Sequence, residues 1–144
     1  MSAAPPPNSA AMTAPFADAE PEHLLFVYGT LLPGEERWAI LEQFVVGAGF
    51  ADSVAGALYD TGEGYPAASF DAGGGRVVGQ VFQLRADRLV EAFEVLDEVE
   101  DAVLGIYRRV RVVTDAGLDV WTYQYGTGLQ LTPIAGGDWL SHPR

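Results

Sequence analysis

The sequence contains no cysteine and no lysine, and only two of its 144 residues are histidines. Without cysteine, disulfides, thiolate nucleophiles and cysteine-bound metals are excluded. Without lysine, Schiff-base chemistry and the lysine of a phosphate-binding loop are excluded. His23 and His142 lie near the two ends of the predicted domain, so neither a Ser-His-Asp triad nor a histidine-bound metal is expected. If this is an enzyme, a carboxylate or a tyrosine must transfer its protons, and we expect no metal and no cofactor.

Basic residues are also scarce. Eight arginines stand against 20 acidic residues, which gives a formal net charge of −12. Such a surface repels phosphate groups, so nucleic acid and anionic membranes are not expected partners. No stretch approaches the roughly 20 apolar residues that a membrane helix needs, and the N-terminal region lacks the basic and apolar segments of a signal peptide. We therefore expect a cytoplasmic protein, and the sequence does not indicate its oligomeric state.

The chain divides into two regions by composition. Residues 1–22 are rich in Ala, Pro and Ser without apolar periodicity, so we predict a disordered leader followed by one domain over residues 23–144. A helix opened by Pro33 and a second helix over residues 86–100 are predicted within the domain. Short apolar or alternating runs between glycine-rich turns predict strands at 24–28, 45–51, 55–60, 66–70, 77–84, 107–114 and 119–126.

These elements predict an α+β fold. Most of the strands follow one another in hairpin-like succession, so the pairing should be mostly antiparallel. A small, partly closed β-barrel would hide the sheet edges. The first helix would bury the side chains of Trp38, Leu41 and Phe44.

A glycine turn, Tyr28-Gly29-Thr30-Leu31, follows the first predicted strand. Residues 29–34 have the glycine spacing of a phosphate-binding loop, but Glu35 and Glu36 stand where Lys and Ser or Thr are required. These carboxylates would repel phosphate. A turn before a helix N-terminus could instead hold a substrate carboxylate or a developing oxyanion on its backbone N–H groups. The alternative, which the local sequence alone favours, is an ordinary glycine turn.

Glu100 stands out among the acidic residues at the end of the second predicted helix. At about 100° per residue, Glu100 falls within the apolar stripe of that helix, whereas Glu98 points to the opposite side. The stripe is formed by Leu89, Phe93 and Leu96.

The surroundings predicted for Glu100 suit an acid–base group. Burial, neighbouring acidic residues and the negative end of the helix dipole would each raise the pKa of its carboxyl group. A raised pKa lets a glutamate exchange protons near neutral pH. The alternative is a structural ion pair with Arg108 or Arg109, and the residues alone do not decide between the two.

Several segments in order resemble the gamma-glutamylcyclotransferase-like family over roughly residues 24–140. Phe26-Val27-Tyr28-Gly29-Thr30-Leu31 is similar to the strand and turn that open this family's domain. Leu96-Asp97-Glu98-Val99-Glu100, with Tyr107-Arg108-Arg109 downstream, resembles its second signature. Further similar segments are Gly64-Tyr65-Pro66-Ala67, Val78-Gly79-Gln80-Val81-Phe82 and Gly137-Asp138-Trp139.

The resemblance implies a small barrel flanked by helices and a cofactor-free reaction on a small-molecule γ-glutamyl substrate. The α-amine of the substrate would attack its own γ-glutamyl carbonyl and release 5-oxoproline. Glu100 would be the acid–base residue. The substrate-binding residues would be Tyr28, Gly29, Thr30, Leu31 and Tyr107.

Two departures from the family pattern bear on the substrate. Asp101 occupies the place of the glycine that usually follows the glutamate, and Glu35-Glu36-Arg37-Trp38 stands where Asn or His is often found. Two other functions are therefore considered. One is a cyclotransferase that acts on a γ-glutamylamine or a carrier-linked γ-glutamyl group. The other is a non-enzymatic domain of the same fold that binds a small molecule.

Overall fold

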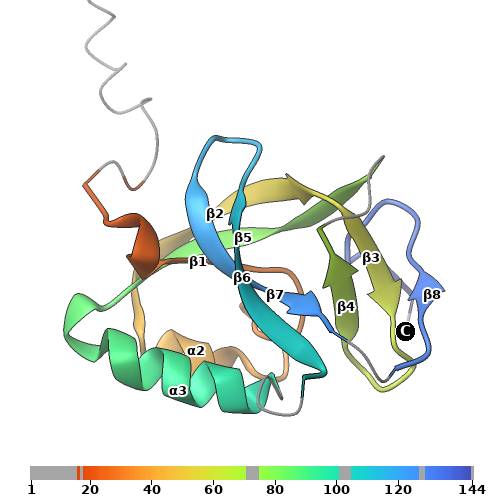
Figure 1. Cartoon of the computed structure of the whole chain (residues 1–144), viewed down its shortest axis with the longest axis horizontal. Helices are drawn as coiled ribbons and strands as arrows, with labels where there is room; N and C mark the ends of the chain where they lie inside the picture. The colour runs from red at the N-terminus through yellow and green to blue at the C-terminus, as the bar shows by residue number, and fades with distance from the viewer. Residues whose placement is uncertain (1–15, 17, 71–74, 101–104, 127–128, 144) are drawn as a thin grey trace, which may run out of the picture.

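The structure, a computed structural model, describes residues 16, 18–70, 75–100, 105–126 and 129–143. Its larger sheet has the strand order β2-β5-β1-β7-β6 and the smaller sheet the order β4-β3-β8 (Figure 1). Every described strand pair is antiparallel except β1 with β7. The strands are β1 (Leu24–Val27), β2 (Val45–Ala55), β3 (Ala57–Asp60), β4 (Pro66–Ser69), β5 (Arg76–Leu84), β6 (Tyr107–Val113), β7 (Asp119–Tyr125) and β8 (Thr132–Pro133).

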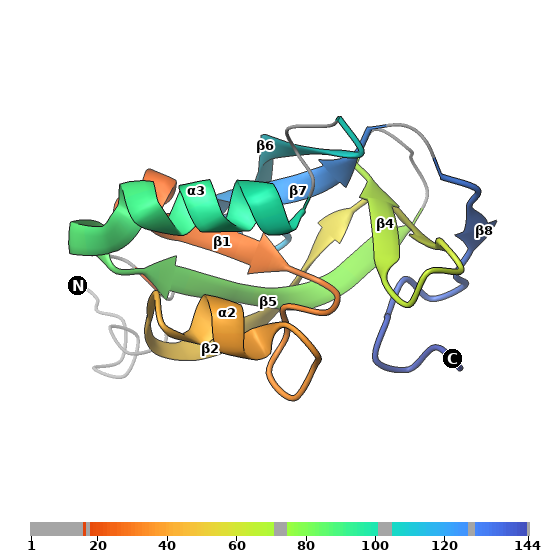
Figure 2. The same cartoon turned by 90° about the horizontal axis from the view of Figure 1, so that it is seen from below.

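Two α-helices cover one face of the larger sheet, as Figure 2 shows. Helix α2 (Trp38–Glu42) precedes β2, and helix α3 (Leu89–Val99) follows β5 through the 3-10 turn η2 (Ala86–Arg88). A further 3-10 turn, η1 (Pro21–His23), leads into β1. Among the described residues, no helix is long and apolar enough to cross a membrane.

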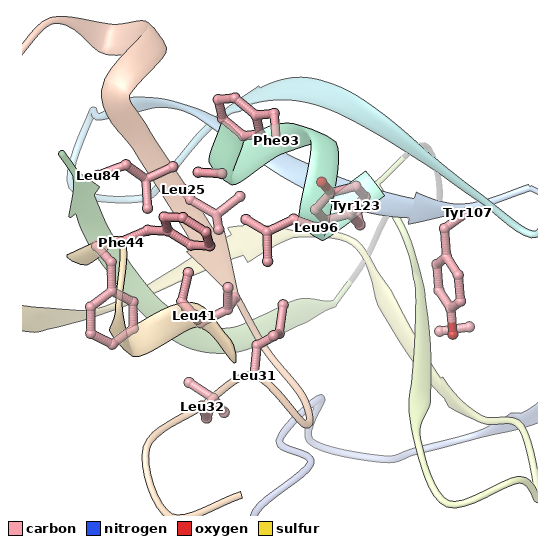
Figure 3. Packing of buried hydrophobic residues seen from close by; sticks show 14 residues of the cluster. Leu25, Leu31, Leu32, Leu41, Phe44, Leu84, Phe93, Leu96, Tyr107 and Tyr123 are labelled. Carbon is pink, nitrogen blue, oxygen red and sulfur yellow. The ribbon is translucent and has the colours of Figure 1, made fainter. Parts of the chain in front are cut away.

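Strand β1 is buried on both faces, which explains its continuous apolar sequence. Leu25 and Val27 belong to a core cluster between the sheet and the helices, together with Leu41 and Phe44 near α2 and Leu96 of α3 (Figure 3). Each fully buried side chain of this size contributes about 1.5–3 kcal/mol to the free energy of unfolding. The core therefore fixes the end of β1, where the chain enters the glycine turn.

The smaller sheet closes over the other face of β1. Leu24 and Phe26 belong to a second core cluster that includes Leu58 of β3 and Trp139 near the C-terminus. The backbone N–H of Phe70, just beyond β4, donates to the Gln124 side chain of β7 at 2.9 Å. The described strands form two separate sheets and not one hydrogen-bonded ring. Packing and hydrogen bonds such as that of Gln124 join the two sheets.

The α+β class and the mostly antiparallel pairing are confirmed, and each predicted strand is present with bounds shifted by a few residues. The helix predicted to open at Pro33 is wrong. Gly34 adopts a left-handed backbone with φ of 85°, so residues 33–37 form turns and α2 begins only at Trp38. Leu41 and Phe44 are buried as predicted, whereas Trp38 is half-buried.

The disordered leader stays a prediction, because residues 1–15 and 17 lie outside the described residues. Of the remaining segment, Phe16 and Ala19 pack against the second core cluster. The carbonyl oxygen of Pro21 accepts a hydrogen bond from Arg111 of β6 at 3.3 Å.

Candidate active site

A pocket lies where β1 ends and the chain turns at Tyr28. The space between its walls, counted together with the open solvent at its mouth, is about 390 Å³. All six residues predicted from the sequence line it, although they come from two distant parts of the chain, residues 28–31 and residues 100–107. The lining residues are Phe26, Val27, Tyr28, Gly29, Thr30, Leu31, Arg37, Tyr65, Pro66, Glu100, Tyr107 and Tyr123.

Glu100 directly follows the last residue of α3. Its backbone N–H donates to the carbonyl oxygen of Leu96 at 2.9 Å, which continues the helical pattern by one residue. The Glu100 side chain is only 14% exposed, whereas Glu98 is exposed. The helical periodicity therefore placed both side chains correctly. Asp101, the departure next to Glu100, lies outside the described residues.

Arg37 is a pocket residue that the sequence argument did not include among its site residues. Its Nη1 atom lies 3.9 Å from Oε2 of Glu100, and its guanidinium carbon lies 5.6 Å from the centre of the Tyr65 ring. The backbone N–H of Arg37 donates to the carbonyl oxygen of Thr30 at 2.8 Å, which ties it to the glycine turn. One signal was present: Arg37 is the only Arg or Lys in the first 75 residues.

Gly29 brings the turn against the smaller sheet. A Cβ atom at this position would lie 2.6 Å from Cγ and 2.8 Å from Cδ of Pro66, too close for any residue but glycine without movement. The turn itself is closed by a hydrogen bond from the N–H of Leu32 to the carbonyl oxygen of Gly29 at 3.0 Å. Because α2 begins only at Trp38, this turn is not at a helix N-terminus, and the helix-dipole argument for it was wrong.

Two tyrosine hydroxyl groups of the pocket are hydrogen-bonded to backbone carbonyl oxygens. Tyr28 donates to the carbonyl oxygen of Tyr123, and Tyr107 donates to that of Pro66 at 2.6 Å. Burial raises the pKa of Tyr28 well above its usual value, and Tyr107 and Glu100 raise it further. Burial also raises the pKa of Tyr107, and the nearby Glu100 raises it further. Both hydroxyls are therefore protonated at neutral pH.

A second carboxylate one turn earlier on α3 is held by a different network. Oδ1 of Asp97 accepts hydrogen bonds from Nε of Arg109 at 3.0 Å and from the Tyr123 hydroxyl at 2.5 Å. The Arg109 guanidinium carbon lies 4.1 Å from the Phe93 ring centre and 4.6 Å from that of Trp121. Burial and the hydrogen bond to Asp97 raise the pKa of Tyr123.

The ion pair considered for Glu100 from the sequence takes another form. Arg109 pairs with Asp97, and Glu100 pairs at longer range with Arg37. Across the described ranges, no cluster of three or more His, Asp or Glu side chains is arranged to hold a metal ion.

Comparison with known proteins agrees with this geometry. A family model described as gamma-glutamyl cyclotransferase, AIG2-like, matches residues 25–141. The chain belongs to this family. A protein of Halalkalibacterium halodurans, provisionally named a gamma-glutamylcyclotransferase, is 37% identical over 89 residues, which are 60% of this chain and 80% of that protein.

Solved structures of the same fold come from distant organisms. An uncharacterized protein from Pyrococcus horikoshii is 26% identical with a TM-score of 0.62, over 81% of this chain and 88% of that one. An AIG2-like protein from Mus musculus is 21% identical with a TM-score of 0.57, over 86% of each chain. The second likeness, at this identity, bears on the fold alone.

Proposed function

We propose that this protein is a cyclotransferase that releases 5-oxoproline from a γ-glutamyl amide. The observation that carries the proposal is the position of Glu100, a largely buried carboxylate in one pocket with the glycine turn. Membership of the gamma-glutamyl cyclotransferase, AIG2-like family supports it. The proposed reaction needs one group that both accepts and donates a proton, and Glu100 is the carboxylate among the described lining residues.

The reaction is an intramolecular acyl transfer. The neutral α-amine attacks the γ-carbonyl carbon, so a new C–N bond closes a five-membered ring. Glu100 accepts a proton from the attacking nitrogen and delivers it to the leaving nitrogen as the original amide C–N bond breaks. The products are 5-oxoproline and a free amine, and Glu100 returns to its carboxylate form.

The other pocket residues would bind and orient the substrate. Backbone N–H groups of the turn at residues 28–31 would stabilise the oxyanion that develops on the γ-carbonyl oxygen. Tyr28 and Tyr107 would form fixed walls, because their hydroxyls are already hydrogen-bonded to backbone carbonyls. A rigid wall holds the amine near the carbonyl carbon, which favours ring closure.

The substitution Glu100→Gln tests the proposal. It keeps the shape of the side chain but removes the exchangeable proton site, so kcat/KM for 5-oxoproline release should fall by at least about 100-fold. In the wild type, the rate should fall at acid pH, because a protonated carboxyl group cannot accept the proton of the attacking amine. The measurement is 5-oxoproline release from a panel of γ-glutamyl amino acids, glutathione and γ-glutamylamines, with a melting curve for each variant.

Glu98→Gln is the matched control. It makes the same change two residues away on the exposed side of α3, so its activity should stay close to that of the wild type. Equal activity in the two variants would show that Glu100 is structural. A small-molecule binding domain without turnover would then be the better description.

A further inference from the structure

The pocket has a pronounced charge pattern. Of the described residues that line it, only Arg37 and Glu100 carry a formal charge at neutral pH. One positive and one negative group therefore lie side by side in a pocket whose other walls are aromatic, aliphatic or hydroxyl-bearing. A ligand that fits this pattern carries both charges close together.

The position of Arg37 is set by the backbone and by an aromatic neighbour. Its N–H is hydrogen-bonded to Thr30 in the glycine turn, and its guanidinium group lies over the Tyr65 ring. Its side chain is 32% exposed against 14% for Glu100, so the guanidinium group is open to an incoming ligand. At 3.9 Å, the contact between Arg37 and Glu100 is longer than a hydrogen bond.

The substrate class of the proposed reaction carries the matching charges. Every γ-glutamyl group has an amine and a carboxylate on the same α-carbon. If Glu100 receives the proton of the α-amine, the α-carboxylate on the same carbon lies close to Glu100, and Arg37 is the adjacent cation, 3.9 Å from Glu100. Arginine is well suited to this contact, because its planar group can donate two parallel hydrogen bonds to one carboxylate.

We propose that Arg37 binds the α-carboxylate of the γ-glutamyl group and so selects substrates with a free α-amino-acid end. This inference rests on the proposed function. It assigns Arg37 a role in specificity, at a place in the sequence where the chain departs from the usual family pattern. It also separates two tasks within the pocket: the glycine turn takes the γ-carbonyl oxygen, and Arg37 takes the carboxylate.

The test compares two amides that differ only at the α-carbon. One is a γ-glutamyl amide, and the other is the corresponding 4-aminobutyryl amide, which has the amine but lacks the α-carboxylate. In the wild type, kcat/KM should favour the γ-glutamyl amide. In Arg37→Gln, the ratio of the two kcat/KM values should fall by about 10- to 100-fold, the size expected for a lost hydrogen bond to a charged group. Most of the loss should be in KM, because the contact is present before and during the reaction.

Two further variants serve as controls for the loss of a positive charge and for the loss of an arginine outside the pocket. Arg37→Lys keeps the charge and should recover part of the ratio. Arg85→Gln removes an exposed arginine that pairs with Asp87, outside the pocket, and should leave the ratio at its wild-type value. An equal loss on both amides in Arg37→Gln would mean that Arg37 acts through Glu100 and would overturn the inference. A loss confined to substrates whose leaving group carries a carboxylate would overturn it as well.

Binding of the product provides a readout that does not depend on turnover. By calorimetry, the wild type should bind 5-oxoproline, which keeps the carboxylate, more tightly than 2-pyrrolidinone, which lacks it. Arg37→Gln should abolish this difference. If no variant turns over any amide but the difference is present and depends on Arg37, the proposed reaction is wrong and the carboxylate site stands. If turnover is normal and the difference does not depend on Arg37, the reaction stands and this inference is wrong.

Discussion

Asp97 and Glu100 lie one turn apart at the end of α3, and each meets an arginine from elsewhere in the chain. Asp97 is 3.0 Å from Arg109, whose guanidinium group lies over the rings of Phe93 and Trp121. Asp97 also accepts a hydrogen bond from the hydroxyl group of Tyr123. Glu100 is 3.9 Å from Arg37 in the pocket. The side chain of Glu100 is nevertheless the more buried of the two, at 14% against 30% exposure.

The difference is the one we expect between a pair that stabilises the fold and a pair that binds a ligand, as proposed for Arg37 and Glu100. A short contact with several donors satisfies a carboxylate and fixes its neighbours. A long contact leaves room for a small molecule to interpose its own charged groups between the partners.

The comparison predicts that a substitution at Asp97 lowers the stability of the fold much more than a substitution at Glu100. Asp97→Ala removes the acceptor of the buried Tyr123 hydroxyl and the partner of Arg109, which should lower the free energy of unfolding by about 2 kcal/mol. For a domain of this size, Tm should fall by roughly 5–10 °C. Glu100→Gln should change Tm by less than about 3 °C, because glutamine keeps the shape of the side chain and can still form hydrogen bonds. The measurement is thermal unfolding of both variants at neutral pH.

Activity should show the reverse order. Well below its Tm, Asp97→Ala should retain kcat/KM within about tenfold, since Asp97 acts on the pocket only through Tyr123. Equal losses of Tm in the two variants, or a larger loss of activity in Asp97→Ala, would contradict the distinction between the pairs.

The sequence could predict the position of Glu100 but neither of the two pairings. Helical periodicity placed Glu100 toward the pocket and Glu98 toward solvent, because both depend only on the local geometry of α3. The choice of Arg109 for Asp97 depends on the register of β6 on β7, where Arg109 lies opposite Tyr123. That register is a long-range property, so the sequence left an ion pair between Arg109 and Glu100 open.

The same limit applies to the first turn and to the strands. Alternating runs located β5, β6 and β7 within a few residues, but β8 has only two residues, one of them Pro133, and gives no pattern to detect. The left-handed backbone at Gly34 ended the expected helix and left Arg37 ahead of α2. Whether Arg37 points toward Glu100 follows from the packing of the turn against α3, which no local pattern encodes.

A further prediction concerns the glycine turn, to which the backbone of Arg37 is hydrogen-bonded. In Gly29→Ala, the new Cβ atom would meet the rigid ring of Pro66 at 2.6 Å, so the turn must move away from β4. Displacement of the backbone N–H groups should lower kcat/KM by about tenfold. Gly34→Ala is the control: its Cβ meets no atom within 4 Å, but its φ of 85° should reduce stability by about 1–2 kcal/mol with little effect on kcat/KM. A drop in activity for Gly34→Ala as large as for Gly29→Ala would show that turn stability, and not its position, limits the reaction.

The smallest expected effect comes from a third carboxylate, Asp60, which does not line the pocket and serves as a reference for the other two. Asp60 of β3 accepts hydrogen bonds from the N–H of Gly62 at 2.8 Å and pairs with His142 at 2.9 Å. These contacts, the Gly62 hydrogen bond first, lower the pKa of the Asp60 carboxyl group below its usual value. A carboxylate with a depressed folded-state pKa stabilises the fold at pH values above the unfolded pKa, about 3.9, and loses this contribution as the pH falls through the folded value.

Asp60→Asn should therefore lower Tm by a few degrees at most at pH 7, and the difference from the wild type should shrink as the pH is lowered from 5 to 3. Melting curves of the two proteins across this range test the prediction. A Tm loss at pH 7 as large as that of Asp97→Ala would mean that a partly exposed pair stabilises this fold as much as the Asp97 network, and the contrast between Asp97 and Glu100 would lose its basis.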